Sequence, residues 1–373
     1  MAGLPAKAPV EFWLIAPARS AIYAEVGSVR EGGTEMTTEE LSTRDTLWRM
    51  ANGYQVSQAI HVVATLGIAD LLKDGPRSAD ELAEATGTHA GALYRILRAL
   101  ASAGVFVEQS DGRFGLTPLA EHLRTDVPDS LRSWAMLMGR PYLFTAWGHI
   151  LHSVKTGEPA FPKVYGMTAW EYRAAHPEES AIFDAAMTGL SLAEAEAVVR
   201  SYDFSDVGVL VDVGGGKGAL LAAILAANPA LRGILFDQPH VIAGAQDLLE
   251  RAGVAGRCEV VGGSFFEAVP EGADAYLLKS IIHDWDDASA IEILRTCRTA
   301  MADSARLLLV ERGIRPANEP DPAKFIDLMM LVMLGGQERT AEEYEKLYTE
   351  AGFKLTNIIR TGSLLDIIEG VPG

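Results

Sequence analysis

The stretch "LVDVGGGKGALLAAIL", residues 210 to 225, constrains the fold of this chain more than any other feature. An apolar run ends in an acid, meets consecutive glycines and then continues as an apolar segment without a strand-like alternation. This pattern is typical of a strand, a tight turn and a helix at the ligand-binding edge of an open α/β sheet. The turn predicts a nucleotide-like ligand, whose identity has to be argued from the neighbouring residues.

Three kinds of ligand use such a turn. A nucleoside triphosphate site needs a Lys followed by Ser or Thr, but Gly218 follows Lys217, so this interpretation fails. A nicotinamide dinucleotide is harder to dismiss, because Asp237 ends the next candidate strand and the pattern G-x-G-x-x-[GA] is satisfied by Gly214, Gly216 and Ala219. Asp237 alone does not decide, because a carboxylate there would accept hydrogen bonds from the ribose of either a dinucleotide or S-adenosylmethionine.

Asp212 separates these two ligands. It lies just before the glycines, at the carboxyl end of the strand, where ligands of open α/β sheets bind. A dinucleotide would bring a pyrophosphate near this carboxylate, whereas S-adenosylmethionine brings an ammonium and a sulfonium. The acid therefore favours the methyl donor, and the glycines permit positive φ and a close approach of backbone to ligand. A structural turn without a ligand would require Asp212, the glycines and Asp237 to coincide.

The 373 residues are enough for two domains, and the patterns divide them into four segments. We expect residues 1–40 to be a loose extension, because Met36, followed by "TTEELSTRD", resembles a natural start. Residues 41–135 form short helices and one hairpin, residues 136–205 a helical linker rich in large apolar side chains, and residues 206–373 an α/β domain. In this last segment "VGVLVDVG", "GILFDQ", "CEVVGG", "AYLLKS" and "ARLLLVER" predict the strands of a mostly parallel sheet.

The segment 41–135 predicts a winged helix. Ser78 and Glu81 form a capping-box pattern, Gly87 stops that helix, and Asp111-Gly112 marks a hairpin. A winged helix can read DNA, but phosphate contacts need clustered Lys and Arg. The candidate recognition helix offers only Arg95 and Arg98 in a chain of net charge −18. We therefore expect a scaffold or dimerisation module, with no nucleic-acid partner.

Composition narrows the setting further. The acidic balance also opposes binding to an anionic membrane, and no apolar run reaches the length of a membrane span. The two cysteines, Cys258 and Cys297, exclude a disulfide scaffold and suit a reducing compartment. The sequence thus predicts a cytoplasmic protein.

Six motifs in order give the chain a specific resemblance: "FPKVYGMTAWEY", "LVDVGGGKG", "FDQPHVI", "ADAYLLKSIIHDWDD", "LLLVERGI" and "GGQERT". Over roughly residues 45–370 it resembles the class I O-methyltransferases of the plant caffeate type and their bacterial relatives that act on polyketides and other aromatics. The resemblance implies a Rossmann-like S-adenosylmethionine-dependent methyltransferase domain preceded by an all-helical winged-helix dimerisation domain. It also implies a homodimer, and an enzyme that methylates a hydroxyl of an aromatic small molecule.

The resemblance implies that His283 is the general base, flanked by Glu311 and Glu338. We expect Glu311 to hold the imidazole and Glu338 to support it from the other side. The residues alone agree in part, because His283 and Glu311 each follow the carboxyl end of a candidate strand and so face one cleft. The neighbouring acids could suggest magnesium, but "HDWDD" fits a helix N-terminus, so we predict no metal.

Lys279, four residues before the catalytic His, and Asp237 are donor-binding positions by resemblance. The donor site is expected to comprise Asp212, Gly214, Gly216, Asp237, Gln238, Gly263, Ser264, Phe265 and Lys279. Ser264 departs from the plant pattern, which has Asp there.

For the acceptor, Trp170, Phe183 and Met187 match positions of the caffeate-type enzymes, and the remaining candidates follow from composition and proximity. The full acceptor set is Trp134, Met138, Phe144, Trp170, Phe183, Met187, Asp284, Met330 and Met333. Where caffeate-type enzymes carry a polar Asn, this chain offers Met333 or Leu334, which favours a larger and more apolar aromatic than a small catechol.

Three alternatives stay open at this point. A winged-helix regulator would need a basic recognition helix, and an NAD-dependent oxidoreductase would need tight nicotinamide binding despite Asp212. The third is an N-methyltransferase or a non-methylating relative on the same fold, against which the presence of both His283 and Glu311 argues.

Overall fold

The computed structural model describes residues 42–373, which fall into two compact units, one ending at Thr125 and one spanning Asp126–Gly373. The predicted extension, residues 1–40, lies outside the described residues. The first unit ends before residue 135, where we expected the first domain to end. The reason is that α8 (Arg132–Met138) packs against α13 (Pro177–Ser201) of the second unit.

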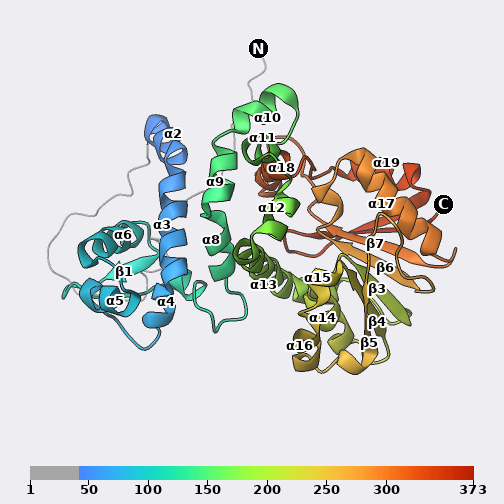
Figure 1. Ribbon diagram of the computed structural model, residues 1–373, viewed down its shortest axis with the longest axis horizontal. Helices are drawn as coiled ribbons and strands as arrows, with labels where there is room; N and C mark the ends of the chain where they lie inside the picture. Colours follow the sequence, from blue (N-terminus) through green and yellow to red (C-terminus); the bar gives the residue numbers. More distant parts are fainter. Residues whose placement is uncertain (1–41) are drawn as a thin grey trace, which may run out of the picture. The chain divides into compact units, whose positions relative to one another are not determined.

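The first unit is a set of short helices, drawn in blue and teal in Figure 1. Ser78 and Glu81 form the reciprocal capping box that the sequence predicts, and Gly87 ends the helix in the left-handed conformation. The apolar side of α6 is buried through Leu93, Leu97 and Leu100. The helices are α2 (Thr43–Ala51), α3 (Gly53–Leu66), α4 (Ile68–Leu71), α5 (Ala79–Thr86), α6 (Ala90–Ser102) and α7 (Pro118–Glu121).

The wing is a two-stranded hairpin of β1 (Phe106–Glu108) and β2 (Phe114–Leu116). Gly112 takes a φ of 81° in its turn, as the Asp111-Gly112 signal predicts. Arg77, just before α5, adds an isolated bridge to Phe114. The helix, helix and hairpin arrangement therefore agrees with the predicted winged helix, and the unit is helical apart from this hairpin.

The second unit begins with helices that share one apolar core. Tyr142, Phe161 and Met333 are buried in it, and Tyr142 stacks on Tyr172 with ring centroids 5.2 Å apart. This core joins residues that are distant in sequence, because α18 (Ala323–Met333) contributes to it as well. Besides α8 and α13 the helices are α9 (Pro141–Trp147), α10 (Ile150–Thr156), α11 (Ala160–Tyr165) and α12 (Ala169–Ala175).

A seven-stranded sheet in the order β5-β4-β3-β6-β7-β9-β8 forms the centre of the second unit. All of its strands are parallel except β9, which runs antiparallel to both neighbours. The first five strands in sequence match the predicted ones: β3 (Val209–Val213), β4 (Arg232–Asp237), β5 (Cys258–Gly262), β6 (Ala275–Lys279) and β7 (Arg306–Glu311).

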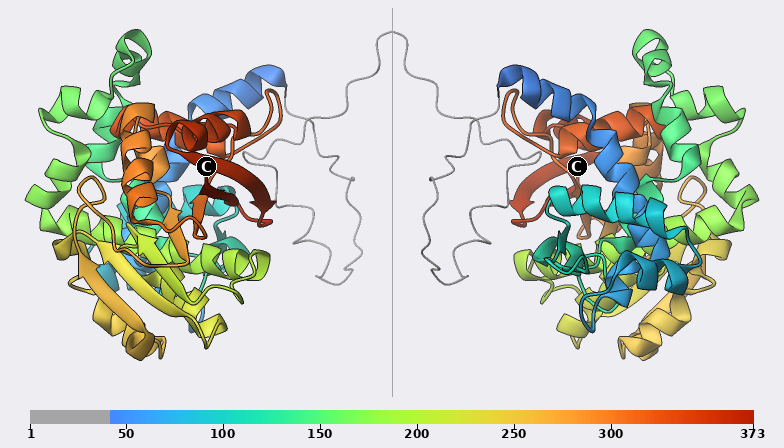
Figure 2. Two further views of the ribbon diagram at one scale, coloured as in Figure 1. Left: turned by 90° about the vertical axis from the view of Figure 1, so that its right-hand side faces the viewer. Right: turned by 90° about the vertical axis from the view of Figure 1, so that its left-hand side faces the viewer.

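The sequence analysis missed the last two strands, β8 (Phe353–Arg360) and β9 (Asp366–Pro372). They form a hairpin that extends the sheet without a helical crossover, and the chain ends beside it (Figures 1 and 2). The burial of β8 does not alternate regularly, because the pairing shifts register between Leu355 and Asn357. A period-2 pattern is therefore weak in this strand.

Helices cover both faces of the sheet. One face is packed by α17 (Asp287–Ala300) and α19 (Ala341–Glu350), and the other by α13, α14 (Ala219–Ala227) and α16 (Ala245–Arg251). Two short segments, α15 (Pro239–Ile242) and the 3₁₀ turn η1 (Ala255–Arg257), flank α16, and a second 3₁₀ turn, η2 (Ile282–Asp284), follows β6. In the part of the chain from residue 42 onward, no helix is long and apolar enough to cross a membrane.

Candidate active site

The turn after β3 contains three consecutive glycines, Gly214, Gly215 and Gly216, at positions that other residues would not readily occupy. Gly214 and Gly216 have φ values of 72° and 60°, a conformation that L side chains rarely adopt. A Cβ on Gly215 would lie 2.6 Å from the carboxyl group of Asp212, and one on Gly214 would lie 2.5 Å from Ile281. Gly215 was not among the predicted site residues, although it lies within the same glycine run.

Two carboxylates face this turn from neighbouring strands. Asp237 at the end of β4 accepts hydrogen bonds from the backbone N–H of Gly216 (2.8 Å) and of Gln238 (2.6 Å). Asp212 is 2% exposed, and its Oδ2 has no hydrogen-bond partner among the described residues. Burial and the nearby Asp237 raise the pKa of Asp212 to about 7, while Lys279 opposes this shift. A buried acid with an unused lone pair fits a cationic ligand group.

The remaining predicted donor residues lie at the carboxyl ends of β5 and β6. Phe265 packs its ring 5.1 Å from Phe266, and Ser264 accepts a hydrogen bond from the Phe266 N–H. A Cβ on Gly263 would collide with the Phe236 ring, so the backbone runs close to β4 there. These positions share one sheet edge with Asp212 and Asp237, because the strands are parallel and in register.

The side chain of Lys279 is paired with residues of helix α13. Its Nζ lies 2.8 Å from a carboxylate oxygen of Glu194 and 3.2 Å from the Ser191 hydroxyl. The charge of Lys279 also acts on Asp212 by lowering its pKa. Lys279 thus influences by its charge the turn formed by Gly214, Gly215 and Gly216 together with Asp212, which we call the donor loop.

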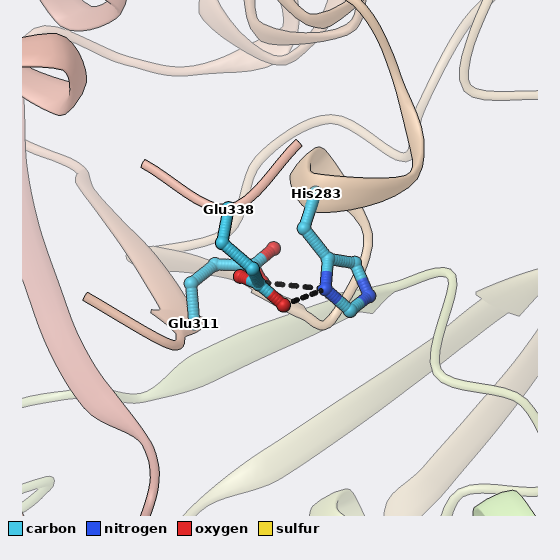
Figure 3. A group of neighbouring side chains, drawn as sticks. All are labelled: His283, Glu311 and Glu338. Atoms are coloured by element: carbon cyan, nitrogen blue, oxygen red, sulfur yellow. Dashed lines mark hydrogen bonds and ion pairs between the residues drawn. The ribbon is translucent and has the colours of Figure 1, made fainter. Parts of the chain in front are cut away.

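His283 stands on η2 and meets two carboxylates at one ring nitrogen (Figure 3). Its Nδ1 is 2.7 Å from Glu338 Oε1 and 3.9 Å from Glu311 Oε2. We expected Glu311 to hold the imidazole with Glu338 on the other side, but both acids lie at Nδ1 and Glu338 is the nearer one. Nε2 faces away from them, with Asp284 Oδ1 at 3.4 Å.

Glu311 has a second task that explains its distance from the ring. Its Oε1 accepts the backbone N–H groups of Ile281 (3.0 Å) and Ile282 (2.9 Å), which begin the turn carrying His283. Ser280, just before them, has a φ of 53°. The carboxylate of Glu311 thus orients the turn directly and the imidazole through its charge.

The charges around His283 shift several pKa values. Burial opposes a charged imidazole, but Glu311, Asp284 and Glu338 outweigh it and raise the pKa of His283 to about 9. Burial raises the pKa of Asp284 to about 6, and burial also raises that of Glu311 against the pull of His283. The cluster therefore retains a proton at neutral pH and holds it chiefly on the imidazole.

Arg339 is a functional neighbour that the sequence reasoning missed. It is fully buried and donates to the carbonyls of Ile282 (3.0 Å) and Trp285 (2.9 Å), on both sides of His283. It also pairs with Asp287 at the start of α17. In the motif "GGQERT" the sequence points only to the acid, whereas the arginine holds the turn that carries His283.

His283, Glu311 and Glu338 offer ligand atoms within 4.8 Å of one another, the spacing of a possible metal site. Adjacent ligands of a tetrahedral ion at ~2.0–2.1 Å would be about 3.3 Å apart. The 2.7 Å between Nδ1 and Glu338 is shorter than this and is the length of a charge-assisted hydrogen bond. The arrangement in the structure is thus that of an imidazole hydrogen-bonded to a carboxylate.

The predicted acceptor residues are brought together only in part. Four are half-buried against the helical core, Met330 and Met333 are buried in α18, and Asp284 lies beside His283. Phe144 and Trp170 are exposed by 37% and 38%. The Trp170 ring meets Phe183 edge to face with centroids 6.0 Å apart. The four half-buried residues are Trp134, Met138, Phe183 and Met187.

Comparison with known families agrees with this geometry. Residues 147–354 match the model of the O-methyltransferase domain, and residues 48–126 match that of the O-methyltransferase dimerisation domain. The chain belongs to the O-methyltransferase family.

The matches to individual relatives cover nearly the whole length of those proteins. Phenazine O-methyltransferase PhzM of Lysobacter antibioticus is 48% identical over 326 residues, covering 87% of this chain and 95% of that protein. The crystal structure of LaPhzM superposes with a TM-score of 0.86 at 47% identity, covering 89% of this chain and all of that one. The chain is thus an S-adenosylmethionine-dependent O-methyltransferase by family, with the predicted helical domain and Rossmann-like domain confirmed.

A third relative bears on the cofactor. The structure of NcsB1 from neocarzinostatin biosynthesis was solved with S-adenosylmethionine and 2-hydroxy-5-methyl naphthoic acid. It has a TM-score of 0.74 at 36% identity and covers 85% of this chain and 96% of that one. The predicted cofactor is thereby confirmed for the family, and the NAD-dependent oxidoreductase and the DNA-reading regulator are set aside.

Proposed function

We propose that this chain transfers the methyl group of S-adenosylmethionine to a hydroxyl of an aromatic small molecule, with His283 as general base. The observation that carries the proposal is the 2.7 Å contact between Nδ1 of His283 and Glu338, which leaves Nε2 as the nitrogen that can take a proton. A base whose other nitrogen is held by a carboxylate has a fixed tautomer and orientation.

The raised pKa makes this base well matched to a phenol. A phenol of pKa ~10 would transfer its proton to an ordinary imidazole at a cost of about 5 kcal/mol, but to one of pKa about 9 at about 1.4 kcal/mol. Nε2 of His283 receives the proton, Glu338 accepts the Nδ1–H, and the charge of Glu311 stabilises the imidazolium. At neutral pH the free imidazole is mostly protonated, so activity should rise as the pH approaches 9.

The donor residues fit the cofactor on their own chemistry. The buried Asp212 has a carboxylate oxygen without a partner, the glycines leave room for a close ligand, and Asp237 ends the next strand. We infer that Asp212 holds the cationic amino-acid part of the donor and Asp237 its ribose. When bound, S-adenosylmethionine supplies a methyl group activated on a sulfonium.

The acceptor side favours a broad and apolar aromatic. Trp134, Met138, Phe183, Met187 and Met333 combine flat rings with methionines that adapt to the shape of a ligand. Relatives in the family differ in the atom they methylate: phenazine-1-carboxylate N-methyltransferase of Pseudomonas aeruginosa is 33% identical over 325 residues, covering 87% of this chain and 96% of that protein. A base held by two acids supports O-methylation here, because a neutral ring nitrogen has no proton to lose.

The test is a product screen. The full chain is incubated with isotopically labelled S-adenosylmethionine and a panel of phenols, naphthols, hydroxyphenazines and N-heteroaromatics, and the products are analysed by mass spectrometry with fragmentation. We expect label on oxygen of polycyclic phenols. Label on nitrogen alone would overturn the O-methylation, and donor binding without transfer to any aromatic would overturn the proposed function.

We further propose that the chain works as a homodimer through its first unit, in the cytoplasm. On α2 and the start of α3, Leu47, Trp48, Met50 and Tyr54 are 68%, 63%, 47% and 54% exposed, an apolar face that favours a partner. Cys258 and Cys297 are both free, which suits a reducing compartment. A monomer by light scattering at micromolar concentration would contradict the dimer.

A further inference from the structure

Arg173 on α12 is a buried cation with an unusual set of neighbours. It is only 7% exposed, and its guanidinium carbon lies 4.3 Å from the ring centroid of Trp170 and 3.8 Å from that of Phe183. Its Nε donates to the Ala169 carbonyl at 3.1 Å. Among the described residues, no carboxylate lies within ion-pair distance of Arg173, and its two terminal nitrogens donate no hydrogen bond.

This arrangement leaves the charged end of Arg173 without an ionic partner among the described residues. Burial lowers the pKa of Arg173, but a guanidinium stays protonated in proteins, so the charge remains. Two aromatic faces offset part of the cost through cation–π contacts. The rings do not satisfy the two terminal nitrogens, for which the described chain supplies no hydrogen-bond acceptor and which therefore stay available to water or to a ligand.

The position of Arg173 ties it to the reacting centre. Trp170 and Phe183, which enclose its guanidinium, are two of the positions that resemble acceptor contacts of the family. Its charge lowers the pKa of Asp284, whose carboxylate lies 3.4 Å from Nε2 of His283. Arg173 therefore acts electrostatically on the acid that lies beside Nε2 of His283.

The charges around His283 bear on which ligand group the guanidinium of Arg173 would bind. Asp284, Glu311 and Glu338 surround His283, so an anionic acceptor would be repelled unless a fixed cation faced it. Arg312 also lowers the pKa of Asp284, and its Nε has no hydrogen-bond partner among the described residues, but its charge is already paired with Glu194 at 3.4 Å. A guanidinium is well suited to a carboxylate, which it binds through two parallel N–H···O bonds.

We propose that Arg173 is a specificity-determining residue that binds a carboxylate on the aromatic acceptor, so that the chain prefers aromatic hydroxy acids over neutral phenols with the same ring. This rests on the proposed function, since it names the class of acceptor for the same site. The ring of the acceptor would lie among Trp170, Phe183 and their neighbours, with its hydroxyl toward His283.

The experiment uses a matched pair of probes, a hydroxynaphthoic acid and the naphthol that lacks its carboxylate. Binding to the full chain saturated with S-adenosylhomocysteine is measured by calorimetry, and kcat/KM is measured with S-adenosylmethionine. We expect wild type to favour the acid by at least about tenfold in both readouts. Arg173→Gln should lower affinity and kcat/KM for the acid by about 10- to 150-fold, the range of hydrogen bonds to charged groups, and change those for the naphthol by less than about threefold.

Two further variants separate recognition from structure. Arg173→Lys keeps the charge without the fork and should retain part of the preference for the acid. Arg140→Gln is the matched control, because Arg140 is paired with Glu179 in the same helical region and should leave the preference unchanged. Donor affinity should be unaltered in all three.

Several outcomes would overturn the proposal. These are equal loss for both probes in Arg173→Gln, equal binding of both probes by wild type, or failure of wild type to bind the acid. In each of these cases methylation of neutral phenols would leave the proposed function standing. Absence of transfer to every aromatic hydroxyl would instead count against the proposed function itself.

Discussion

The donor loop and the histidine cluster both place buried carboxylates at the same edge of the sheet, but they differ in what balances the charge. Oδ2 of Asp212, at the end of β3, has no hydrogen-bond partner among the described residues. Glu311 at the end of β7 accepts two backbone N–H groups, and Glu338 accepts from His283. Asp212 therefore has an oxygen available for a cationic ligand, whereas Glu311 and Glu338 already lie beside the imidazole of His283.

This difference assigns the two regions their chemistry. A buried acid without a cation has its pKa raised, as in Asp212, and gains most when a charged ligand arrives. Acids that share an imidazole instead raise the pKa of that imidazole, as in His283, and make it a stronger base. Under the proposed function, the same residue type would thus bind a ligand in one region and tune a proton acceptor in the other.

The largest expected effect is the loss of the imidazole. His283→Ala should lower kcat by about 10²- to 10⁴-fold, the usual contribution of general-base catalysis, while the Kd of S-adenosylmethionine stays near wild type. Steady-state kinetics with an acceptor of ordinary phenol acidity and calorimetry of the donor check both parts. His149→Ala, which changes an exposed histidine, is the control. An unchanged rate in His283→Ala would mean that the chain works by proximity alone.

The two regions were not equally predictable from the sequence. Asp212, Gly214 and Gly216 lie in one short motif whose geometry is local, so the residues alone pointed to them. Gly215 was not predicted, because a larger residue is excluded there by contact with the side chain of Asp212. A glycine motif in the sequence does not reveal such a contact.

The histidine cluster depends on long-range packing. Which acid touches Nδ1 is decided by β7 and by the segment before α19, which meet only in the folded sheet. Arg173 was not among the predicted site residues, and its burial depends on the fold, which places Trp170 and Phe183 against its guanidinium. Side chains that gain their role from such packing cannot be identified by periodicity or motif.

The second effect concerns the donor. Asp212→Asn should weaken binding of S-adenosylmethionine by about 10- to 150-fold, since it removes a charge-assisted contact in a buried site. Calorimetry measures the Kd, and Asp247→Asn on the exposed side of α16 is the control. Unchanged affinity in Asp212→Asn would show that the buried acid is structural.

The pH dependence of donor binding sharpens this test. Below a pH of about 7 free Asp212 carries a proton, which a cationic ligand must displace. Affinity should therefore rise with pH toward 7, by at most about tenfold per pH unit, and then level off. In Asp212→Asn this rise should be absent, whereas a rise that persists would assign the titration to another group such as Asp237, whose pKa burial also raises.

The smallest effect concerns the two glutamates. Glu311→Gln and Glu338→Gln each remove a charge that raises the pKa of His283, so the rising limb of the pH profile of kcat should move to lower pH in both. The profile moves in this direction because the neutral imidazole is the active form, and a lower pKa of His283 makes that form available at a lower pH. In both variants kcat at high pH should fall less than in His283→Ala, because the imidazole itself is retained.

A further comparison separates charge from contact in the same pair. Glu338→Ala loses the 2.7 Å hydrogen bond that fixes the tautomer, so its plateau rate should fall well below that of Glu338→Gln, where the amide oxygen still accepts the Nδ1–H. Glu342→Gln, at an exposed position of α19, should leave the profile unchanged. A limb that stays in place for both Gln variants would mean that the acids hold the turn and the imidazole without tuning its pKa, and the contrast with Asp212 would then be one of geometry alone.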